Sequence, residues 1–118
     1  MANPRKDQSI LQHIVEHCQK IAALQERFGK DISVFIADFA YYDSVFMNLL
    51  QIGELANHLS KGFQGKHKNI PWRQIIDLRN IIVHGYGTVK ANLLWKTVCD
   101  DVPLLHSQIL EILSKIEN

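Results

Sequence analysis

The chain has 118 residues, of which 47% are hydrophobic and 21% are charged, and its formal net charge is +1. This size and composition predict a single domain over residues 1–118 with one buried core, and they exclude an intrinsically disordered protein. Near-neutrality also excludes a strong overall attraction to nucleic acid, so any basic patch would have to be local. A polar amino terminus and the lack of a bilayer-spanning apolar run predict a cytoplasmic protein that does not contact the membrane.

The first half of the chain has the apolar spacing of amphipathic helices. A first helix is expected from about residue 9 to Gly29, and Asp31 can cap a short second segment that runs through Phe39. A longer helix follows, ending at Gly62, in which apolar residues recur at alternating steps of four and three. Because these steps average about 3.5 residues, we expect this helix to pack nearly parallel or antiparallel to a neighbour.

The second half begins with residues 61–69, a polar segment with two glycines and three lysines that predicts a loop. Pro71 then suits the first turn of a helix that runs through Val83 and stops near Gly85. Thr88 is expected to cap a short helix to about Cys99, and the Asp-Asp-Val-Pro sequence at residues 100–103 to start the last one. With no strand pattern and no repeat, the sequence predicts an all-α, up-and-down bundle of about five helices.

The two cysteines, Cys18 and Cys99, are far apart and have no Cys-x-x-Cys spacing. Both occur in apolar helical patterns, so we expect them to be reduced residues that contribute to packing.

The helix that follows Pro71 carries a polar stripe. At about 100° per residue, Asp77, Asn80 and His84 fall within about 40° of Arg73, opposite three apolar residues, Ile75, Leu78 and Ile82. His84 is expected at the exposed carboxyl end of the helix, where the helix dipole favours its protonated form. A histidine that gains and loses a proton near neutral pH suits proton transfer.

Arg79 lies about 120° from this stripe on the same helix, and we expect it to be partly buried. Its partner is then either a carboxylate, such as Glu54 on the preceding helix, or a bound phosphate; alternatively, Glu54 faces solvent. Arg79 and His84 are about 140° apart on an ideal helix, so spacing alone does not bring them together. Unwinding near Gly85 or a second protomer would be needed.

Residues 79–86 have the form Arg-x4-His-x-Tyr, with the polar Asn80 directly after the arginine. Three other stretches accompany this motif: Ile-Gly-Glu-Leu-Ala at residues 52–56, Ile-Pro-Trp at 70–72 and Leu-Trp at 94–95. Together they resemble the HepT-like family of the HEPN superfamily, and the resemblance covers most of the chain in order.

This resemblance implies a HEPN-like helical bundle that forms a homodimer, with both motifs lining a cleft at the interface. It also implies metal-independent endoribonuclease activity on RNA such as tRNA or mRNA. In that activity, His84 would act as general acid or base and Arg79 would stabilise the developing charge on the phosphate. Asn80 would orient His84 or the substrate, with Glu54 as a supporting residue. No metal or cofactor is implied.

The resemblance further implies a toxin paired with an antitoxin, a minimal nucleotidyltransferase of the MNT type. That partner would neutralise the toxin by adenylylating Tyr86, because a bulky anionic group there would block the cleft and repel RNA. An alternative interpretation is a non-catalytic helical module that serves as the substrate-binding partner of a nucleotidyltransferase. The near-neutral charge fits this alternative somewhat better.

Two further patterns have competing interpretations. Lys61, Lys66, Lys68 and Arg73, together with His67, would form a basic rim for RNA, or they are simply solvated charges. The sequence His-Ile-Val-Glu-His at residues 13–17 matches an inverted zinc-protease motif. Since a zinc site needs a third ligand and a cleft, we expect no metal there.

Overall fold

The structure is a computed structural model that describes residues 4–85 and 91–117, with the side chains of residues 5–80 and 91–116. Most of these residues are helical and none of them forms a strand, which confirms the all-α prediction. The helices are α1 (Pro4–Phe28), α2 (Ile32–Ala37), α3 (Phe39–Asn57), α4 (Lys61–Lys66), α5 (Trp72–Gly85), α6 (Ala91–Lys96) and α7 (Val102–Glu117), with a π-helical turn, η1 (Thr97–Asp101), between the last two.

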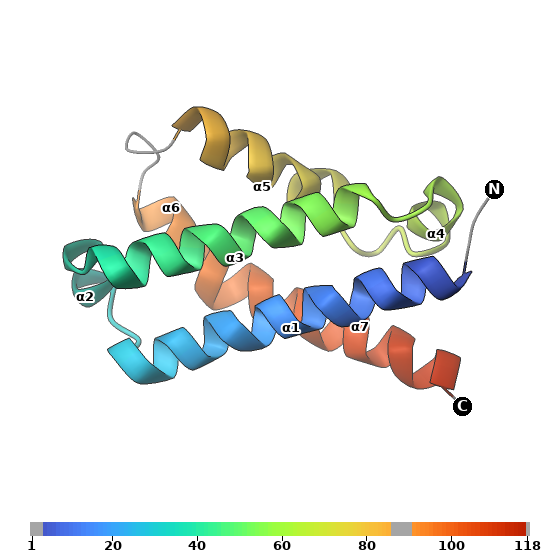
Figure 1. The fold of residues 1–118 in the computed structure, drawn as a ribbon, viewed down its shortest axis with the longest axis horizontal. Coiled ribbons are helices and arrows are strands. Elements are labelled where there is room, and N and C mark those ends of the chain that lie inside the picture. Colours follow the sequence, from blue (N-terminus) through green and yellow to red (C-terminus); the bar gives the residue numbers. More distant parts are fainter. Residues whose placement is uncertain (1–3, 86–90, 118) are drawn as a thin grey trace.

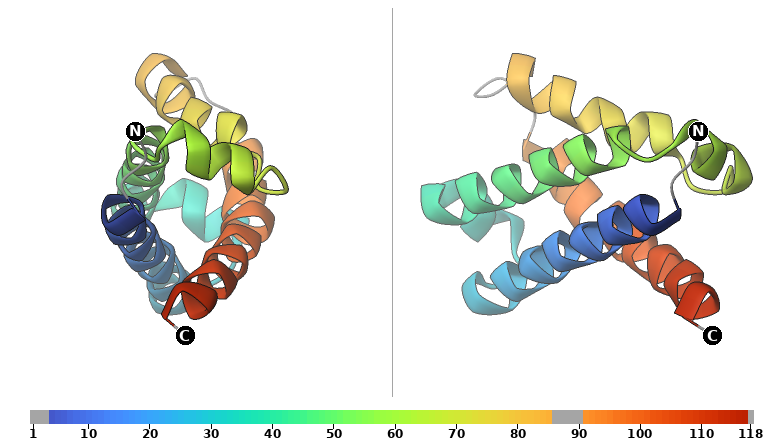
Figure 2. Two further views of the ribbon diagram at one scale, coloured as in Figure 1. Left: turned by 90° about the vertical axis from the view of Figure 1, so that its right-hand side faces the viewer. Right: turned by 45° about the vertical axis from the view of Figure 1, so that its right-hand side comes forward.

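Four long helices, α1, α3, α5 and α7, alternate in direction along the long axis of a body of 44 × 29 × 20 Å (Figure 1). α3 contacts α1 on one side and α5 on the other, while α7 packs against α1 (Figure 2). The expected up-and-down bundle is therefore confirmed. α3 lies nearly antiparallel to α1, as its apolar spacing predicts.

One core runs through the bundle and takes its side chains from each long helix. The apolar residues expected to share one helical face are all buried: Val45, Leu49, Ile52 and Ala56 of α3, and Leu59 just after it. The expected end of this helix at Gly62 is wrong, because α3 ends at Asn57. At the α2 end, the ring of Phe35 contacts Tyr41 at 5.3 Å and Trp95 at 5.0 Å between centroids. These aromatic contacts fix α2 and α6 to the long helices. Cys18 is buried and Cys99 half-buried, and both thiols are free, as predicted.

The starts of α2 and α3 follow from two aspartates. Asp31 caps α2 by accepting a hydrogen bond from the backbone N–H of Ser33 at 2.8 Å. Asp38 caps α3 by accepting one from the N–H of Ala40 at 2.9 Å. An aspartate carboxylate at this position satisfies N–H groups that a helix leaves free, so the chain breaks into two helices at Asp38.

The prediction of a loop over residues 61–69 is wrong for its first six residues, which form α4. Ser60 caps this helix, because its Oγ accepts a hydrogen bond from Phe63 N–H at 3.2 Å. Ser60 is itself fixed by the buried Asp7 of α1, whose carboxylate accepts from the Ser60 N–H at 2.9 Å and from its hydroxyl at 2.7 Å. This long-range anchor outweighs the weak helix propensity of Gly62 and Gly65.

The predicted boundary near Asp100 is also wrong. α6, η1 and α7 form one continuous helical segment over residues 91–117, and Thr88, the expected cap, lies outside the described residues. In the π turn, the N–H of Val102 donates to the carbonyl of Thr97, five residues back. This wider turn directly precedes Pro103, which has no N–H to donate, so the helix passes the proline without ending.

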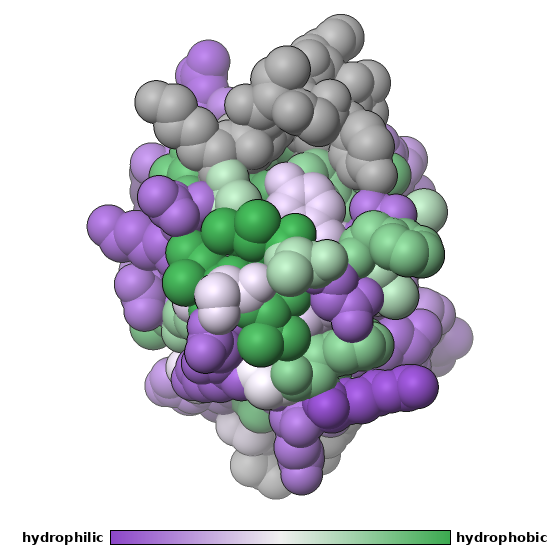
Figure 3. Space-filling model, turned by 90° about the vertical axis from the view of Figure 1, so that its left-hand side faces the viewer, coloured by the Kyte–Doolittle hydropathy of each residue, from purple (hydrophilic) through white to green (hydrophobic). Residues whose placement is uncertain are grey.

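The end of the bundle formed by α2 exposes apolar side chains (Figure 3). Among them are Ile36, which is 53% exposed, and Phe39, which is 80% exposed. α5 ends on the same side of the molecule (Figure 1). No helix in the described part of the chain is both long and apolar enough to cross a membrane.

Candidate active site

α3 and α5 lie close together at Gly53. A Cβ atom at this position would lie 3.1 Å from the carbonyl oxygen of Ile75 and 3.3 Å from the backbone nitrogen of Arg79. Both contacts are tighter than ordinary packing, and both are with backbone atoms of α5. A glycine at position 53 therefore allows the close contact that holds the Arg79 segment against α3.

The next residue of α3, Glu54, forms an ion pair with Arg79. The Arg79 Nη1 lies 3.4 Å from the Glu54 Oε1. The arginine side chain is 38% exposed and the glutamate side chain 41%, so Arg79 is partly buried as predicted and Glu54 does not simply face solvent. A pair with this much solvent contact adds at most about 1 kcal/mol to stability, so its main effect is on the direction of the guanidinium.

The polar stripe of α5 is present among the described side chains. Arg73, Asp77 and Asn80 are exposed, whereas Ile75 is buried and Leu78 is half-buried. α5 continues through the backbone of His84. The side chain of His84 and the whole of Tyr86 lie outside the described residues.

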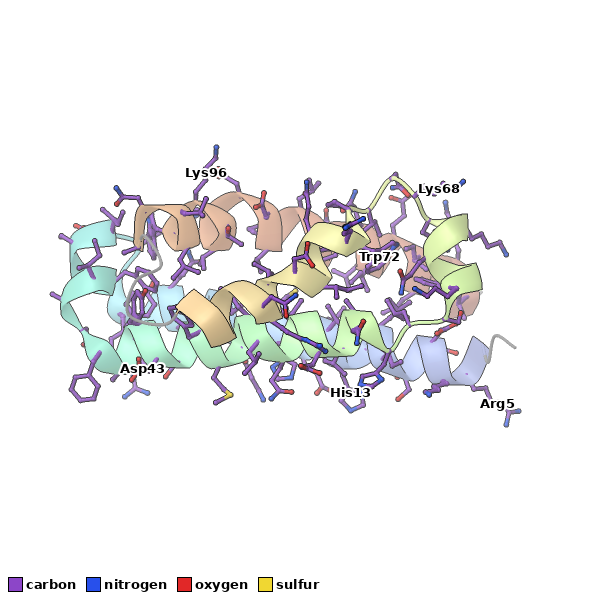
Figure 4. The ribbon with its side chains drawn as sticks, turned by 90° about the horizontal axis from the view of Figure 1, so that it is seen from above. Arg5, His13, Asp43, Lys68, Trp72 and Lys96 are labelled. Carbon is purple, nitrogen blue, oxygen red and sulfur yellow. The ribbon has the colours of Figure 1, made fainter. Side chains whose placement is uncertain are left out.

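The four basic residues predicted as an RNA-binding rim, Lys61, Lys66, Lys68 and Arg73, are all exposed. They cluster around α4 and the start of α5, where Figure 4 labels Lys68 and Trp72. Because α5 has 14 residues, its two ends are about 20 Å apart. The basic rim and the last turn of α5 are thus at opposite ends of the helix.

One further cation of this region, Lys115 of α7, is not recognisable from the sequence. It lies with Lys66 and His67 around a single cavity, although more than 45 residues separate it from α4 along the chain. In the sequence, Glu111 precedes Lys115 by four residues, which indicates only an ordinary surface ion pair. The structure contains this pair, with 3.4 Å between the Lys115 Nζ and the Glu111 Oε1. No local signal connects α7 to α4.

An apolar groove of about 230 Å³ lies between α5 on one side and α6 and α7 on the other. Ile75 and Leu78 line it from α5, and Leu93 and Leu104 line it from the opposite wall. Leu93 is 55% exposed and Leu104 is 56% exposed, so the groove presents large apolar side chains to solvent next to the motif helix.

The two histidines of the zinc-like pattern are engaged in hydrogen bonds. The Nδ1 of His13 lies 2.7 Å from the carbonyl oxygen of Ser9, and the Nδ1 of His17 lies 2.8 Å from the Oδ1 of Asn48. Among the residues that the structure describes, no group of three or more His, Cys, Asp and Glu side chains is arranged to hold a metal ion.

Comparison with known proteins assigns this bundle to a class. The family described as "HepT-like: Ribonuclease HepT-like" matches residues 11–112. The chain therefore belongs to the HepT-like ribonuclease family of the HEPN superfamily. No solved structure is significantly similar to it.

Three relatives illustrate the similarity. "Putative RNase TTE0752" of Caldanaerobacter subterraneus subsp. tengcongensis is 30% identical over 105 residues, which are 89% of this chain and 92% of the relative. "Probable ribonuclease HepT" of Thermococcus cleftensis is 32% identical over 103 residues, 86% of this chain and 90% of the relative. "Gamma-glutamylcyclotransferase and putative RNase MJ0434" of Methanocaldococcus jannaschii is 32% identical over 116 residues, 96% of this chain and 50% of that longer protein.

Proposed function

We propose that the protein is a metal-independent endoribonuclease with Arg79, Asn80 and His84 as its catalytic residues. The observation that carries this proposal is the Arg79–Glu54 ion pair next to the exposed Asn80, in a chain of the HepT-like ribonuclease family. Glu54 directs the guanidinium toward one side of α5, and Gly53 keeps that side close to α3. A fixed guanidinium suits a phosphate whose charge increases during reaction.

In this mechanism the ribose 2′-hydroxyl attacks the adjacent phosphorus atom. His84 accepts the hydroxyl proton, and Arg79 stabilises the charge that develops on the phosphate oxygens. The bond from phosphorus to the 5′ oxygen breaks, and that oxygen takes up a proton. The products carry a 2′,3′-cyclic phosphate and a 5′-hydroxyl. Because the attacking group belongs to the RNA itself, the reaction requires no metal-bound water.

A second copy of the chain would complete the site. Arg79 pairs with α3, whereas the stripe that includes Asn80 faces solvent, so the two parts of the motif have different directions on one helix. The exposed leucines of the groove beside α5, Leu93 and Leu104, offer an apolar surface for such a homodimer. A partner helix in this groove would bring another motif helix close to α5.

We also propose that the nuclease is the toxin of a toxin–antitoxin pair. Its partner would be an MNT-type nucleotidyltransferase that transfers an adenylyl group from ATP to the Tyr86 hydroxyl and releases pyrophosphate. The added phosphate would repel RNA at the cleft. The support for this step is family membership together with the motif tyrosine at position 86.

The proposal is tested by incubating the purified protein, shown by mass spectrometry to be unmodified at Tyr86, with RNA in the presence of EDTA. We expect cleavage that leaves 2′,3′-cyclic phosphate ends. His84→Ala should lower the rate by about 10²- to 10⁴-fold, the usual contribution of a general acid or base. His106→Ala, a substitution in α7, is the matched control. Intact RNA with both the unmodified wild type and His84→Ala would instead favour the non-catalytic interaction module.

A further inference from the structure

A cavity lies at the opposite end of α5 from His84. It has a volume of about 560 Å³, is open to solvent on one side, and is lined by the start of α1, by α4 with the residues that follow it, and by the end of α7. This volume falls within the usual range of small-molecule sites. We call it the α4 cavity.

One wall of the α4 cavity is aromatic and apolar. Phe63 is half-buried and packs against His67 with 4.5 Å between ring centroids, and Trp72 lies behind it at 5.9 Å. Ile112 and Ile116 of α7 line the cavity as well. The Trp72 indole N–H donates to the His67 carbonyl at 3.0 Å, which fixes this wall to α5. A rigid aromatic platform with a polar rim suits a flat aromatic ligand.

The rim of the cavity carries amino and amide groups. Lys66 and Lys115 contribute ammonium groups from α4 and α7, and Asn69 contributes an amide. Burial and the positive charges of Lys66 and Lys115 lower the pKa of His67, so both lysines act on the same imidazole from two separate helices. The rim is therefore locally electropositive around His67.

Two carboxylates also line the cavity, and each has a partner. Both oxygens of Asp7 accept hydrogen bonds from Ser60. Glu111 lies 3.4 Å from Lys115 in an ion pair whose side chains are 75% and 70% exposed. Such exposed pairs are weak, so a phosphate group can replace the carboxylate beside Lys115.

We propose that the α4 cavity binds one unpaired nucleotide of the RNA substrate, several nucleotides away from the bond that is cleaved. The base stacks on Phe63, and the phosphate binds Lys66 and Lys115 (Figure 4 shows this end of the molecule around Lys68 and Trp72). This inference rests on the proposed ribonuclease function and adds a second contact with RNA about 20 Å along α5 from the motif. It selects single-stranded substrates that reach both sites.

The test measures binding of a fluorescein-labelled single-stranded RNA oligonucleotide by fluorescence anisotropy, in the full chain with His84→Ala so that the RNA stays intact. Removing both charges with Lys66→Gln and Lys115→Gln should weaken RNA binding by about 10-fold. It should also reduce the slope of log affinity against log salt concentration by about one or two, because one or two fewer counterions are released on binding. Phe63→Leu keeps most of the apolar volume and should weaken binding by at least about 5-fold.

The matched control removes two lysines elsewhere, with Lys20→Gln and Lys30→Gln, both of which are exposed. We expect this control to retain wild-type affinity, and thermal melts by circular dichroism to show that all variants fold. Equal RNA affinity in the two double variants would overturn the inference. So would a Lys66→Gln, Lys115→Gln variant that binds RNA like the wild type but no longer self-associates in sedimentation. The cleavage assay of the wild type tests the proposed ribonuclease function separately. If the wild type cleaves RNA but the two double variants bind RNA equally well, the ribonuclease function stands and only the proposal for the α4 cavity is refuted.

Discussion

The backbone of Gly53 in α3 lies directly against the backbone of Arg79 in α5, where a Cβ atom would come within 3.3 Å of the Arg79 nitrogen. This contact sets the distance between the two helices at the candidate site. It also places Glu54, the next residue, within 3.4 Å of the Arg79 guanidinium. The packing of the bundle and the direction of a catalytic side chain thus depend on the same pair of positions.

Gly53→Ala should destabilise the protein and lower its cleavage rate. Overpacking against backbone costs about 1 to 3 kcal/mol, while replacing a helical glycine by alanine returns about 0.5 to 1 kcal/mol, so a net loss of up to about 2.5 kcal/mol is expected. Urea denaturation measures it. In Gly65→Ala, the matched control in α4, the added Cβ has no atom within 4 Å, and this variant should be as stable as the wild type or more so. Equal effects at both positions would argue against the close contact.

Glu54→Gln should separate activity from stability. The pair with Arg79 is more than one-third exposed on both sides, so its loss should change the free energy of unfolding by less than about 1 kcal/mol. The guanidinium loses its fixed direction, and we expect kcat to fall by at least about 10-fold. Glu16→Gln, at an exposed position of α1, provides the control. If Glu54→Gln keeps wild-type kcat, Glu54 does not position Arg79.

Leu104→Glu should dissociate the proposed dimer and abolish cleavage, because it introduces a charge into the apolar groove beside α5. Leu110→Glu is the control, because Leu110 is on the same helix and is 45% exposed but lines neither the groove beside α5 nor the α4 cavity. Sedimentation velocity and the RNA assay measure the two effects. A dimer that survives Leu104→Glu but dissociates on Phe39→Glu would move the interface to the apolar α2 end.

The buried thiol of Cys18 predicts a loss of stability at alkaline pH. Burial raises its pKa from 9.0 to about 12, so above pH 9 the unfolded chain releases a proton that the folded chain retains. The free energy of unfolding should therefore decrease by up to about 1.4 kcal/mol per pH unit between the two values. Denaturation at several pH values measures the slope. Cys18→Ala is less stable overall but should show a smaller decline; identical slopes would contradict the assignment.

The fold was largely predictable because the spacing of apolar residues in α1, α3, α5 and α7 alone specifies four amphipathic helices. α4 was not predictable, since its start depends on Asp7, more than 50 residues earlier in the chain. One sequence feature does point to Asp7: it precedes Leu11 by four residues and so occupies the buried face of α1.

At the site, the sequence predicted Arg79 as partly buried and named Glu54 as a candidate partner, because the helical angle separates Arg79 from the polar stripe. The sequence also placed the basic residues at the start of the Arg79 helix and His84 at its carboxyl end, which the extent of α5 bears out. It did not predict that Lys115 joins the basic rim. The position of Lys115 depends on how α4 and α7 pack at one end of the bundle, and helical periodicity does not encode that packing.

The most direct test of a site shared between two protomers is complementation. Arg79→Ala and His84→Ala chains with different tags are coexpressed, the mixed dimers are isolated through both tags, and their RNA cleavage rate is measured in EDTA. Each variant alone should be inactive, and the mixed dimer should recover about half of the wild-type rate, because one of its two sites contains both an intact arginine and an intact histidine. An inactive mixed dimer beside an active wild type would show that Arg79 and His84 act within one chain.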